Sequence, residues 1–272
     1  MENAPKPTDA ALAATEETSR TRAAALIGTA DASVMPTRVE PNGLQSDPAD
    51  PSDEVLVDQA GRQLGPRALK TRRKIIEATT ELLAEKPMRE MRVIDIARRI
   101  GSSPATFYQY FKDVEDVVVY LAGQAKEATP ILVEIIDGDW EGPEGIERGK
   151  RLANLVIDHW EKYAPVLRAR NNASDEGHPA LREERMAAMM PLVAAFQAAI
   201  ERAHAKAEAG APEDPAAFNG GRVDPFSGAT ALTSCLERTS MYHQFVQETG
   251  SSRAALIETT AVFLQGMLTS RR

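Results

Sequence analysis

Cysteine is nearly absent from this sequence: Cys235 is the only one in 272 residues. A single thiol can form neither an internal disulfide nor a cysteine-rich zinc site, so we expect a cytoplasmic protein in which Cys235 is a small buried apolar residue. No stretch of about 18 consecutive apolar residues occurs, which predicts that no segment spans a membrane. The N-terminus also lacks the basic and apolar stretches of a secretory signal.

The usual marks of metal binding and catalysis are missing as well. The four histidines have no metal-ligand spacing, and no cysteine or paired carboxylate completes a site, so we expect neither a metal nor a cofactor. No nucleophile elbow, phosphate-binding loop or dinucleotide fingerprint occurs. The sequence therefore predicts a protein that is not an enzyme. Glu237 and Arg238 are expected to form a buried structural ion pair rather than a catalytic group.

Aromatic residues are absent from positions 1–58, which contain six prolines and carry 11 acidic against 4 basic residues. Such a segment cannot bury enough apolar area to offset the entropy lost on ordering, so we expect it to be disordered. Its alanine-rich pattern indicates a transient helix near Asp9–Ile27. The segment is either a passive solubilising tail or an acidic arm that competes with DNA phosphates for a basic surface.

Charge is distributed unevenly along the chain, whose formal net charge is -8. Residues 62–112 hold 12 basic and 5 acidic residues, a net of +7 between two acidic regions. The overall negative charge argues against a nucleic-acid-binding protein, but a basic segment of this size is the electrostatic signature of a DNA-binding module. A run of charged residues is often only a solvated surface. The motif within the segment therefore has to show whether the segment binds DNA.

Helical periodicity dominates from Val114 to the end of the chain, and no alternating pattern long enough for a β-sheet occurs. We therefore expect an all-α protein with three parts: a disordered acidic N-terminal extension at 1–60, a helix-turn-helix domain at 61–113 and a further helical domain at 114–272. A segment rich in glycine, proline and aspartate at Gly210–Asp224 predicts a loop. Helices are expected at Leu181–Ala207, Pro225–Glu248 and Ser252–Leu268.

Three helices are predicted within the basic segment. The first runs from about Pro66 to Lys86 with its apolar residues on one side, and Pro87 ends it. The second covers about Arg92–Ile100. Gly101 follows and suits the tight turn between two crossing helices, because glycine tolerates a positive φ without steric cost.

The third helix is predicted to begin after Ser103, which can cap it, with Pro104 in the first helical position. Phe107 and Phe111 lie four residues apart and are expected to anchor this helix to the core. The other face is then free to enter the major groove of DNA. The side chains expected on or near that face are Pro104, Thr106, Tyr108, Gln109 and Tyr110.

This segment resembles the TetR family of transcription regulators. The resemblance is carried by Val-Ile-Asp-Ile-Ala at 93–97, Gly-Ser-Ser at 101–103 and Thr-Phe-Tyr-Gln-Tyr-Phe-Lys at 106–112. It implies a sequence-specific DNA-binding transcription regulator, by default a repressor, that acts as a homodimer on a palindromic operator of double-stranded DNA. The DNA-binding residues that it implies are Arg92, Ser103, Pro104, Ala105, Thr106, Tyr108, Gln109, Tyr110 and Lys112.

The resemblance also implies a role for each of these positions. Residues 103–106 form the base-facing start of the helix, and Tyr108 and Tyr110 occupy positions that contact phosphates. Gln109 lies where a base contact is often made, and its amide can recognise the edge of an adenine.

Two departures from the family pattern affect the expected contacts. The family often has threonine at the start of the second helix, where this chain has Arg92 and Val93. We expect Arg92 to replace the lost phosphate contact by its charge. The family also often has lysine two residues after the position of Lys112, where this chain has Val114. The corresponding backbone contact is therefore in doubt.

For the helical domain at 114–272, the resemblance implies ligand binding and dimerisation, with a pocket for a small apolar ligand. Two half-sites about 34 Å apart are contacted by two symmetry-related helices, which requires a dimer. Pro225–Glu248 and Ser252–Leu268 are the expected dimer helices. The apolar stripe expected on the last helix comprises Ala254, Ala255, Ile257, Ala261, Val262, Leu264 and Leu268.

The stretch 236–239, Leu-Glu-Arg-Thr, followed by Phe245, resembles a mycobacterial subgroup of the family that controls ethionamide activation. By that resemblance, Thr233 and Leu236 replace polar amides of the pocket, which suggests a more apolar ligand. The expected ligand-binding residues are Val156, Trp160, Tyr163, Met190, Phe196, Thr233 and Leu236. A helix near Val114–Ala128 is expected to transmit ligand binding to the DNA-binding domain.

Two alternatives remain open at this point. An architectural DNA-binding protein without ligand control predicts a filled C-terminal core and little preference among DNA sites. A helical carrier of lipophilic ligands, or a helical enzyme, predicts no salt-dependent DNA binding.

Overall fold

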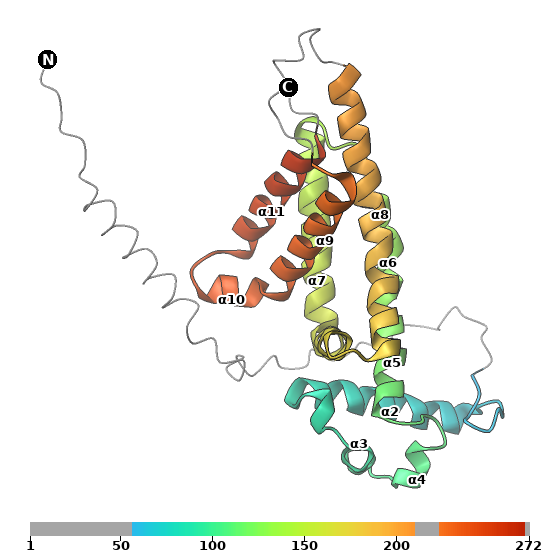
Figure 1. Cartoon of the computed structure of the whole chain (residues 1–272). Helices are drawn as coiled ribbons and strands as arrows, with labels where there is room; N and C mark the ends of the chain where they lie inside the picture. The colour runs from blue at the N-terminus through green and yellow to red at the C-terminus, as the bar shows by residue number, and fades with distance from the viewer. Residues whose placement is uncertain (1–55, 210–222, 270–272) are drawn as a thin grey trace, which may run out of the picture. The chain divides into compact units, whose positions relative to one another are not determined.

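The computed structural model describes residues 56–209 and 223–269, all of which belong to one unit, Ser52–Arg272. Helices account for most of the described residues, so the predicted all-α fold is confirmed (Figure 1). The helices are α2 (Pro66–Glu85), α3 (Val93–Arg99), α4 (Pro104–Phe107), α5 (Val114–Ala125), α6 (Thr129–Ile136), α7 (Gly142–Asp175), α8 (Pro179–Ala209), α9 (Pro225–Met241), α10 (His243–Glu248) and α11 (Arg253–Leu268), with short 3-10 turns at Met88–Glu90 (η1) and Lys126–Ala128 (η2).

The helices α2, α3 and α4 form a three-helix head whose bounds follow local sequence signals. α2 begins at Pro66, as predicted, because proline lacks the N–H that has no partner in the first turn of a helix. It ends at Glu85, and Lys86 is extended because Pro87 disfavours a helical residue before it. Gly101 has a φ of +66°, the left-handed conformation that the predicted turn between α3 and α4 requires.

α4 is shorter than the third helix predicted from the sequence, since it spans only Pro104–Phe107. The backbone then continues as a tighter turn. The Gln109 N–H donates to the Thr106 carbonyl at 3.3 Å, and the Tyr110 N–H donates to the Phe107 carbonyl at 2.9 Å. These bonds span three residues and so have the 3-10 geometry that is common at helix ends.

Two hydrophobic clusters stabilise the described residues, and α7 contributes to both. The head cluster lies around α2–α5 and includes Ile75 and Phe107. The C-terminal cluster involves α6–α9 and α11 and includes both tryptophans, Trp140 and Trp160. α7 supplies Trp160 to the C-terminal cluster and, near its own C-terminal end, Ala173 to the head cluster. α7 therefore connects the two cores.

α7 and α11 pack closely at Gly149, where an added Cβ would lie 2.9 Å from the Ala261 Cα. Ala261, Leu264 and Leu268 are buried, whereas Val262 is exposed. The apolar stripe expected on this helix for dimerisation therefore divides into two faces. Its buried residues face the interior of the same chain, because α7 covers one side of α11.

One predicted helix is interrupted in the structure, and three predictions fall wholly or mostly outside the described residues. The helix predicted at Pro225–Glu248 is divided into α9 and α10 by a break at Tyr242, which no glycine or proline signals. The segment predicted to be disordered at 1–58 lies outside the described residues except for its last three residues. The predicted transient helix at Asp9–Ile27 and most of the predicted loop at Gly210–Asp224 also lie outside them.

Candidate DNA-binding site

α4 is capped at its start and held from inside by two rings. Ser103 precedes the helix in an extended conformation, and its Oγ accepts a hydrogen bond from the Thr106 backbone N–H at 3.2 Å. The predicted N-cap is therefore confirmed. Phe107 is fully buried and Phe111 nearly so, with their ring centroids 6.1 Å apart. The predicted anchoring is confirmed, and the opposite face of α4 is left accessible.

The candidate DNA-binding side chains of α4 and the turn after it differ in exposure. Tyr108 is 52% exposed, and Gln109 and Ala105 are also exposed. Tyr110 was expected on or near this face but is half-buried and packs against the head cluster. In the tighter turn, residues three apart lie on the same side, so Tyr110 follows the buried Phe107.

A groove of about 650 Å³ separates the start of α2 from α4. Thr106 and Gln109 line it, and Arg67, Thr71 and Lys74 of α2 line it as well. Basic and hydroxyl side chains beside a helix that faces bases are suited to bind the flanking phosphates. The candidate set from the sequence missed these three α2 residues. The basic charge of the segment was the available signal, but it does not tell which cations border α4.

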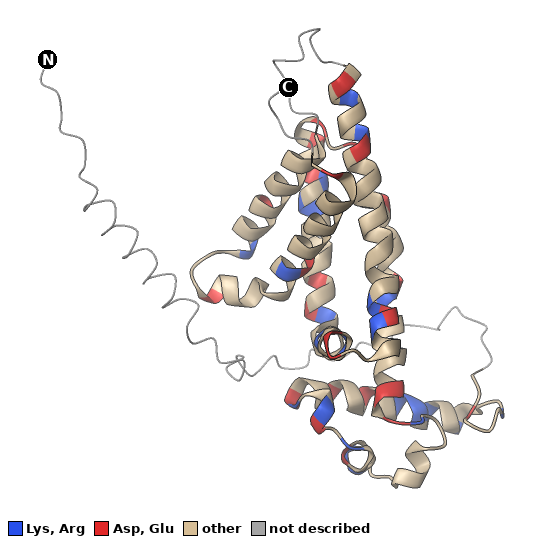
Figure 2. Ribbon diagram, in the orientation of Figure 1, with Lys and Arg blue, Asp and Glu red and all other residues tan. Residues whose placement is uncertain are grey.

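Part of the basic charge is neutralised inside the head. α2 carries Lys and Arg in its first half and Glu in its second half, and α3 carries Asp and Arg (Figure 2). Arg99 of α3 donates to Glu85 at 2.8 Å and to Glu81 at 3.0 Å, and these bonds raise its pKa. The guanidinium of Arg72 lies over the Tyr120 ring at 4.1 Å. The net charge of +7 therefore overstates the number of cations that are free for DNA.

A carboxylate organises the start of α3. Asp95 Oδ2 accepts hydrogen bonds from Lys86 Nζ at 2.8 Å and from the Arg92 backbone N–H at 3.1 Å. These bonds, chiefly the one from Lys86, lower the pKa of Asp95 to about 2. Arg92 is the N-cap residue, and its exposed guanidinium lies 3.6 Å from the same carboxylate. It is thus accessible to a phosphate at the position where the family often has threonine.

Beyond α4, the chain has one exposed cation where the family often has two. Lys112 is exposed, and its backbone N–H donates to Asp116 Oδ2 at 3.0 Å. Val114 is buried in the head cluster. A side chain used for packing makes no phosphate contact, so the contact of the family's lysine has no counterpart at this position.

The candidate ligand-binding residues lie mainly in the C-terminal cluster. Tyr163 packs against that cluster, and Thr233 is buried with its Oγ1 donating to the Ala229 carbonyl at 2.9 Å. Met190 differs, because it is 41% exposed on α8. The buried members of the cluster among the candidates are Val156, Trp160, Phe196 and Leu236.

Glu237 forms a buried polar cluster, but not with the partner expected from the sequence. Its Oε1 accepts a hydrogen bond from Asn171 Nδ2 at 2.9 Å and lies 3.7 Å from Arg170 Nη2. Arg170 is only 5% exposed, and burial lowers its pKa to about 10. Arg238 is exposed and lies beside Tyr242 instead. Its guanidinium bonds to the Tyr242 hydroxyl one turn later, so the expected Glu237–Arg238 pair does not form.

Several other features of the described residues bear on the expected chemistry. Cys235 is half-buried rather than buried, with its Sγ 3.9 Å from Thr239 Oγ1. Within 56–209 and 223–269, no three histidine, cysteine, aspartate or glutamate side chains gather in a way that could hold a metal ion. The same residues include no helix long and apolar enough to cross a bilayer.

A short helix that is anchored by its inner face, bordered by cations and joined to a larger helical domain defines a helix-turn-helix regulator. The chain belongs to the TetR family, which confirms the resemblance seen in the sequence. A family model described as "Bacterial regulatory proteins, tetR family" matches residues 75–121, and one described as "Tetracyclin repressor-like, C-terminal domain" matches residues 132–251. Members of this family are DNA-binding transcription regulators and not enzymes, as expected.

Solved structures show the same fold. GusR of Salmonella enterica is 18% identical, with 75% of this chain and 97% of that chain covered and a TM-score of 0.53. A putative transcriptional regulator from Pseudomonas aeruginosa PAO1 is 15% identical, with coverages of 75% and 93% and a TM-score of 0.53. A TetR-family transcriptional regulator from Streptomyces coelicolor is 16% identical, with coverages of 75% and 82% and a TM-score of 0.51. Among curated proteins, none matches the chain.

Proposed function

We propose that the protein is a homodimeric repressor that binds a palindromic operator and releases it when a small apolar ligand binds. The position of α4 carries the DNA-binding part of this proposal. Phe107 and Phe111 hold the helix from inside, while Tyr108 and Gln109 are exposed. Gln109 also lines the groove that the basic side chains of α2 border. A helix held in this way can enter a major groove without disturbing the core beneath it.

Exposed apolar side chains on the last helices support dimerisation. Phe226 on α9 and Val262 and Phe263 on α11 are exposed in the single chain. Large apolar surfaces of this kind usually mark an interface, and a second copy would cover them. A two-fold axis would then relate the two α4 helices, as a palindromic operator requires. Analytical ultracentrifugation of the complex is expected to find two chains per operator duplex.

The operator test compares two neighbouring residues of the turn after α4. Tyr108→Phe removes a hydroxyl that we assign to a phosphate, so we expect similar weakening, about three- to ten-fold, on every DNA sequence. Gln109→Ala removes a base contact and is expected to reduce operator affinity about ten-fold while changing affinity for unrelated DNA little. Fluorescence anisotropy with the upstream DNA of the gene and with a scrambled duplex measures both.

Each other outcome of the operator test has a definite meaning. The opposite pattern in the two variants would show that the orientation assigned to α4 is wrong. Equal wild-type affinity for the operator and the scrambled duplex would favour an architectural DNA-binding protein. A wild-type chain with no salt-dependent DNA binding would favour a carrier of lipophilic ligands.

An apolar ligand in the C-terminal cluster would account for release of the operator. The Thr233 hydroxyl is already bonded within its helix, and burial lowers the pKa of His159 to about 4, so this histidine is neutral at pH 7. Neither group favours an ionic ligand. α7 extends from this cluster to the head, where it packs against α2 and α5. A ligand that displaces α7 can therefore change the spacing of the two heads in the dimer.

The ligand test is a titration of the operator complex with apolar compounds. Quenching or enhancement of the fluorescence of Trp140 and Trp160 identifies the compounds that bind in the C-terminal cluster. We expect at least one of these to weaken operator binding about ten-fold or more, because a ligand acts only through its different affinity for the two conformations. Equal operator affinity with and without every tightly bound compound would refute the allosteric part of the proposal.

A further inference from the structure

A small hairpin at residues 56–64 precedes α2. The Leu64 N–H donates to the Leu56 carbonyl at 2.8 Å, and the Asp58 N–H donates to the Arg62 carbonyl at 2.8 Å. An isolated β-bridge pairs Val57 with Gln63 between these two bonds. Leu56–Asp58 were expected to belong to the acidic extension, but they take part in this hairpin.

The tip of the hairpin is shaped by one carboxylate. Asp58 Oδ1 accepts hydrogen bonds from the Ala60 and Arg62 backbone N–H groups, each at 2.9 Å. Gly61 has a φ of +75°, which lets the chain reverse at this point. Backbone hydrogen bonding lowers the pKa of Asp58, so the carboxylate stays ionised and the turn keeps its shape at neutral pH.

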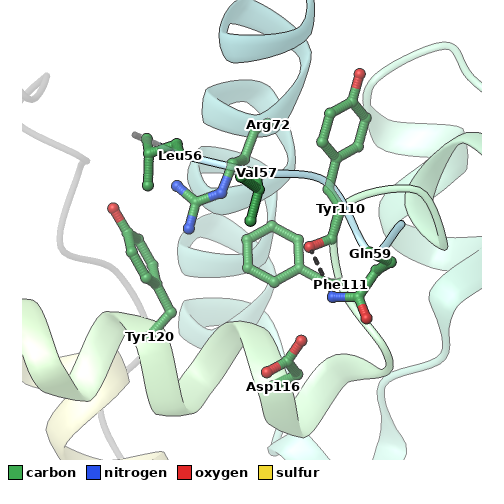
Figure 3. Close-up of a pocket in the computed structure, with 8 residues that line it drawn as sticks. All are labelled: Leu56, Val57, Gln59, Arg72, Tyr110, Phe111, Asp116 and Tyr120. Atoms are coloured by element: carbon green, nitrogen blue, oxygen red, sulfur yellow. Dashed lines mark hydrogen bonds between the residues drawn. The ribbon is translucent and has the colours of Figure 1, made fainter. Parts of the chain in front are cut away.

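The hairpin is bonded to the turn after α4. The Gln59 N–H donates to the Gln109 carbonyl at 3.0 Å, and Gln59 Nε2 donates to the Tyr110 carbonyl at 3.3 Å (Figure 3). Carbonyls at the end of a helix need hydrogen-bond donors from outside it, and Gln59 donates to two such carbonyls. The hairpin therefore lies directly beside Gln109, the residue assigned to a base contact.

Arg62 is the one cation of this hairpin, and its side chain is 77% exposed. Its guanidinium is paired with Asp58, with Nε 2.8 Å and Nη2 2.7 Å from Oδ2. The Asp58 side chain is only 11% exposed, but the guanidinium remains in contact with solvent, and an ion pair at the surface contributes little to stability. Because the Asp58 carboxylate is also bonded to two backbone N–H groups, the turn does not depend on the guanidinium. Arg62 can leave Asp58 while the hairpin stays intact.

We propose that the hairpin is a fourth element of the DNA interface, in which Arg62 exchanges Asp58 for a backbone phosphate next to the bases that Gln109 faces. A duplex in contact with Gln109 passes the hairpin bonded to that residue, within reach of a long arginine side chain. Gln109 itself lines the groove that Arg67 and Lys74 border at the start of α2, so the same stretch of DNA would meet these cations. This inference rests on the DNA-binding function proposed above.

The test is a salt titration of DNA binding by the full chain. Arg62→Gln is expected to weaken binding about three- to ten-fold on operator and scrambled duplexes alike. The slope of log affinity against log salt should fall in magnitude by about 0.9, the value for one phosphate. Arg151→Gln is the matched control, because it removes the same charge from an exposed site on α7. Arg151 lies 24 residues before the C-terminal end of that helix at Asp175. This variant should change neither quantity.

A second variant separates a phosphate contact from a structural ion pair. In Asp58→Asn, the side-chain oxygen still accepts the two backbone bonds but competes less for the guanidinium. Operator affinity should therefore equal or exceed that of the wild type. The inference is overturned if Arg62→Gln matches Arg151→Gln, or if Asp58→Asn weakens binding as Arg62→Gln does. In either case operator binding by the wild type leaves the proposed function standing, whereas a wild type that binds no DNA removes both.

Discussion

Phe107→Ala is expected to lower the free energy of unfolding of the head by about 3–5 kcal/mol and to abolish operator binding. Phe107 is fully buried, and its ring is 6.1 Å from that of Phe111 and 5.7 Å from that of Tyr108. Removing it leaves a cavity directly beneath α4. A four-residue helix has too few internal hydrogen bonds to persist without its tertiary contacts. The exposed face of α4 would then lose its fixed position toward DNA.

Two spectroscopic signals locate the damage caused by this substitution. Both tryptophans, Trp140 and Trp160, lie in the C-terminal cluster, so their fluorescence follows that cluster, whereas circular dichroism follows all helices. We expect the helical signal of Phe107→Ala to decrease at lower denaturant than the fluorescence changes. The control is Leu69→Ala, because Leu69 is exposed on α2 and its loss should change stability by less than about 0.5 kcal/mol. Wild-type operator affinity in Phe107→Ala would contradict the anchoring role.

Glu237→Leu is expected to destabilise the protein by about 3 kcal/mol or more, because it leaves the buried guanidinium of Arg170 without its carboxylate. Arg170 remains bonded to Asn171 Oδ1 at 2.9 and 3.0 Å, but these bonds carry no compensating charge. Denaturant unfolding followed by tryptophan fluorescence measures the change. Glu183→Leu removes the same charge from an exposed site on α8 and should alter stability by less than about 0.5 kcal/mol.

A double variant distinguishes charge burial from lost packing. When Arg170→Met is combined with Glu237→Leu, no charge in this pair remains buried, and we expect most of the lost stability to return. Arg185, the other cation near Glu237, keeps Asp175 as a partner at 2.6 Å. A double variant as unstable as Glu237→Leu alone would show that the loss comes from shape and not from the unpaired guanidinium.

Local signals explain why the head could be predicted from the sequence in detail. Pro66, Pro87, Ser103 and Pro104 set helix bounds through their own backbone chemistry, and the spacing of Phe107 and Phe111 indicated the buried side of α4. Each signal acts over a few residues. Where the backbone departs from ideal geometry, the prediction was less accurate. The tighter turn after Phe107 places Tyr110 against the core, although regular helical spacing put it on or near the exposed face.

Contacts between distant segments were not predictable in the same way. Gln59 bonds to the turn after α4, and it lies 51 residues before Tyr110. The partners of Glu237 include Asn171, which lies 66 residues earlier. No periodicity in the sequence connects such pairs. For the same reason, the apolar residues of α11 could be recognised as an apolar stripe but not divided into those covered by α7 and those left exposed.

The sequence by itself determined the helical class, the position of the DNA-binding motif and the identity of the residues that cap and anchor α4. These properties depend on hydrogen bonds and side-chain spacing within one or two turns of the backbone. Only the tertiary structure decided which cations border α4, which carboxylate neutralises Arg170, and that a hairpin before α2 supports the turn containing Gln109. Those outcomes depend on how separate helices pack together, which brings into contact side chains that no local pattern relates.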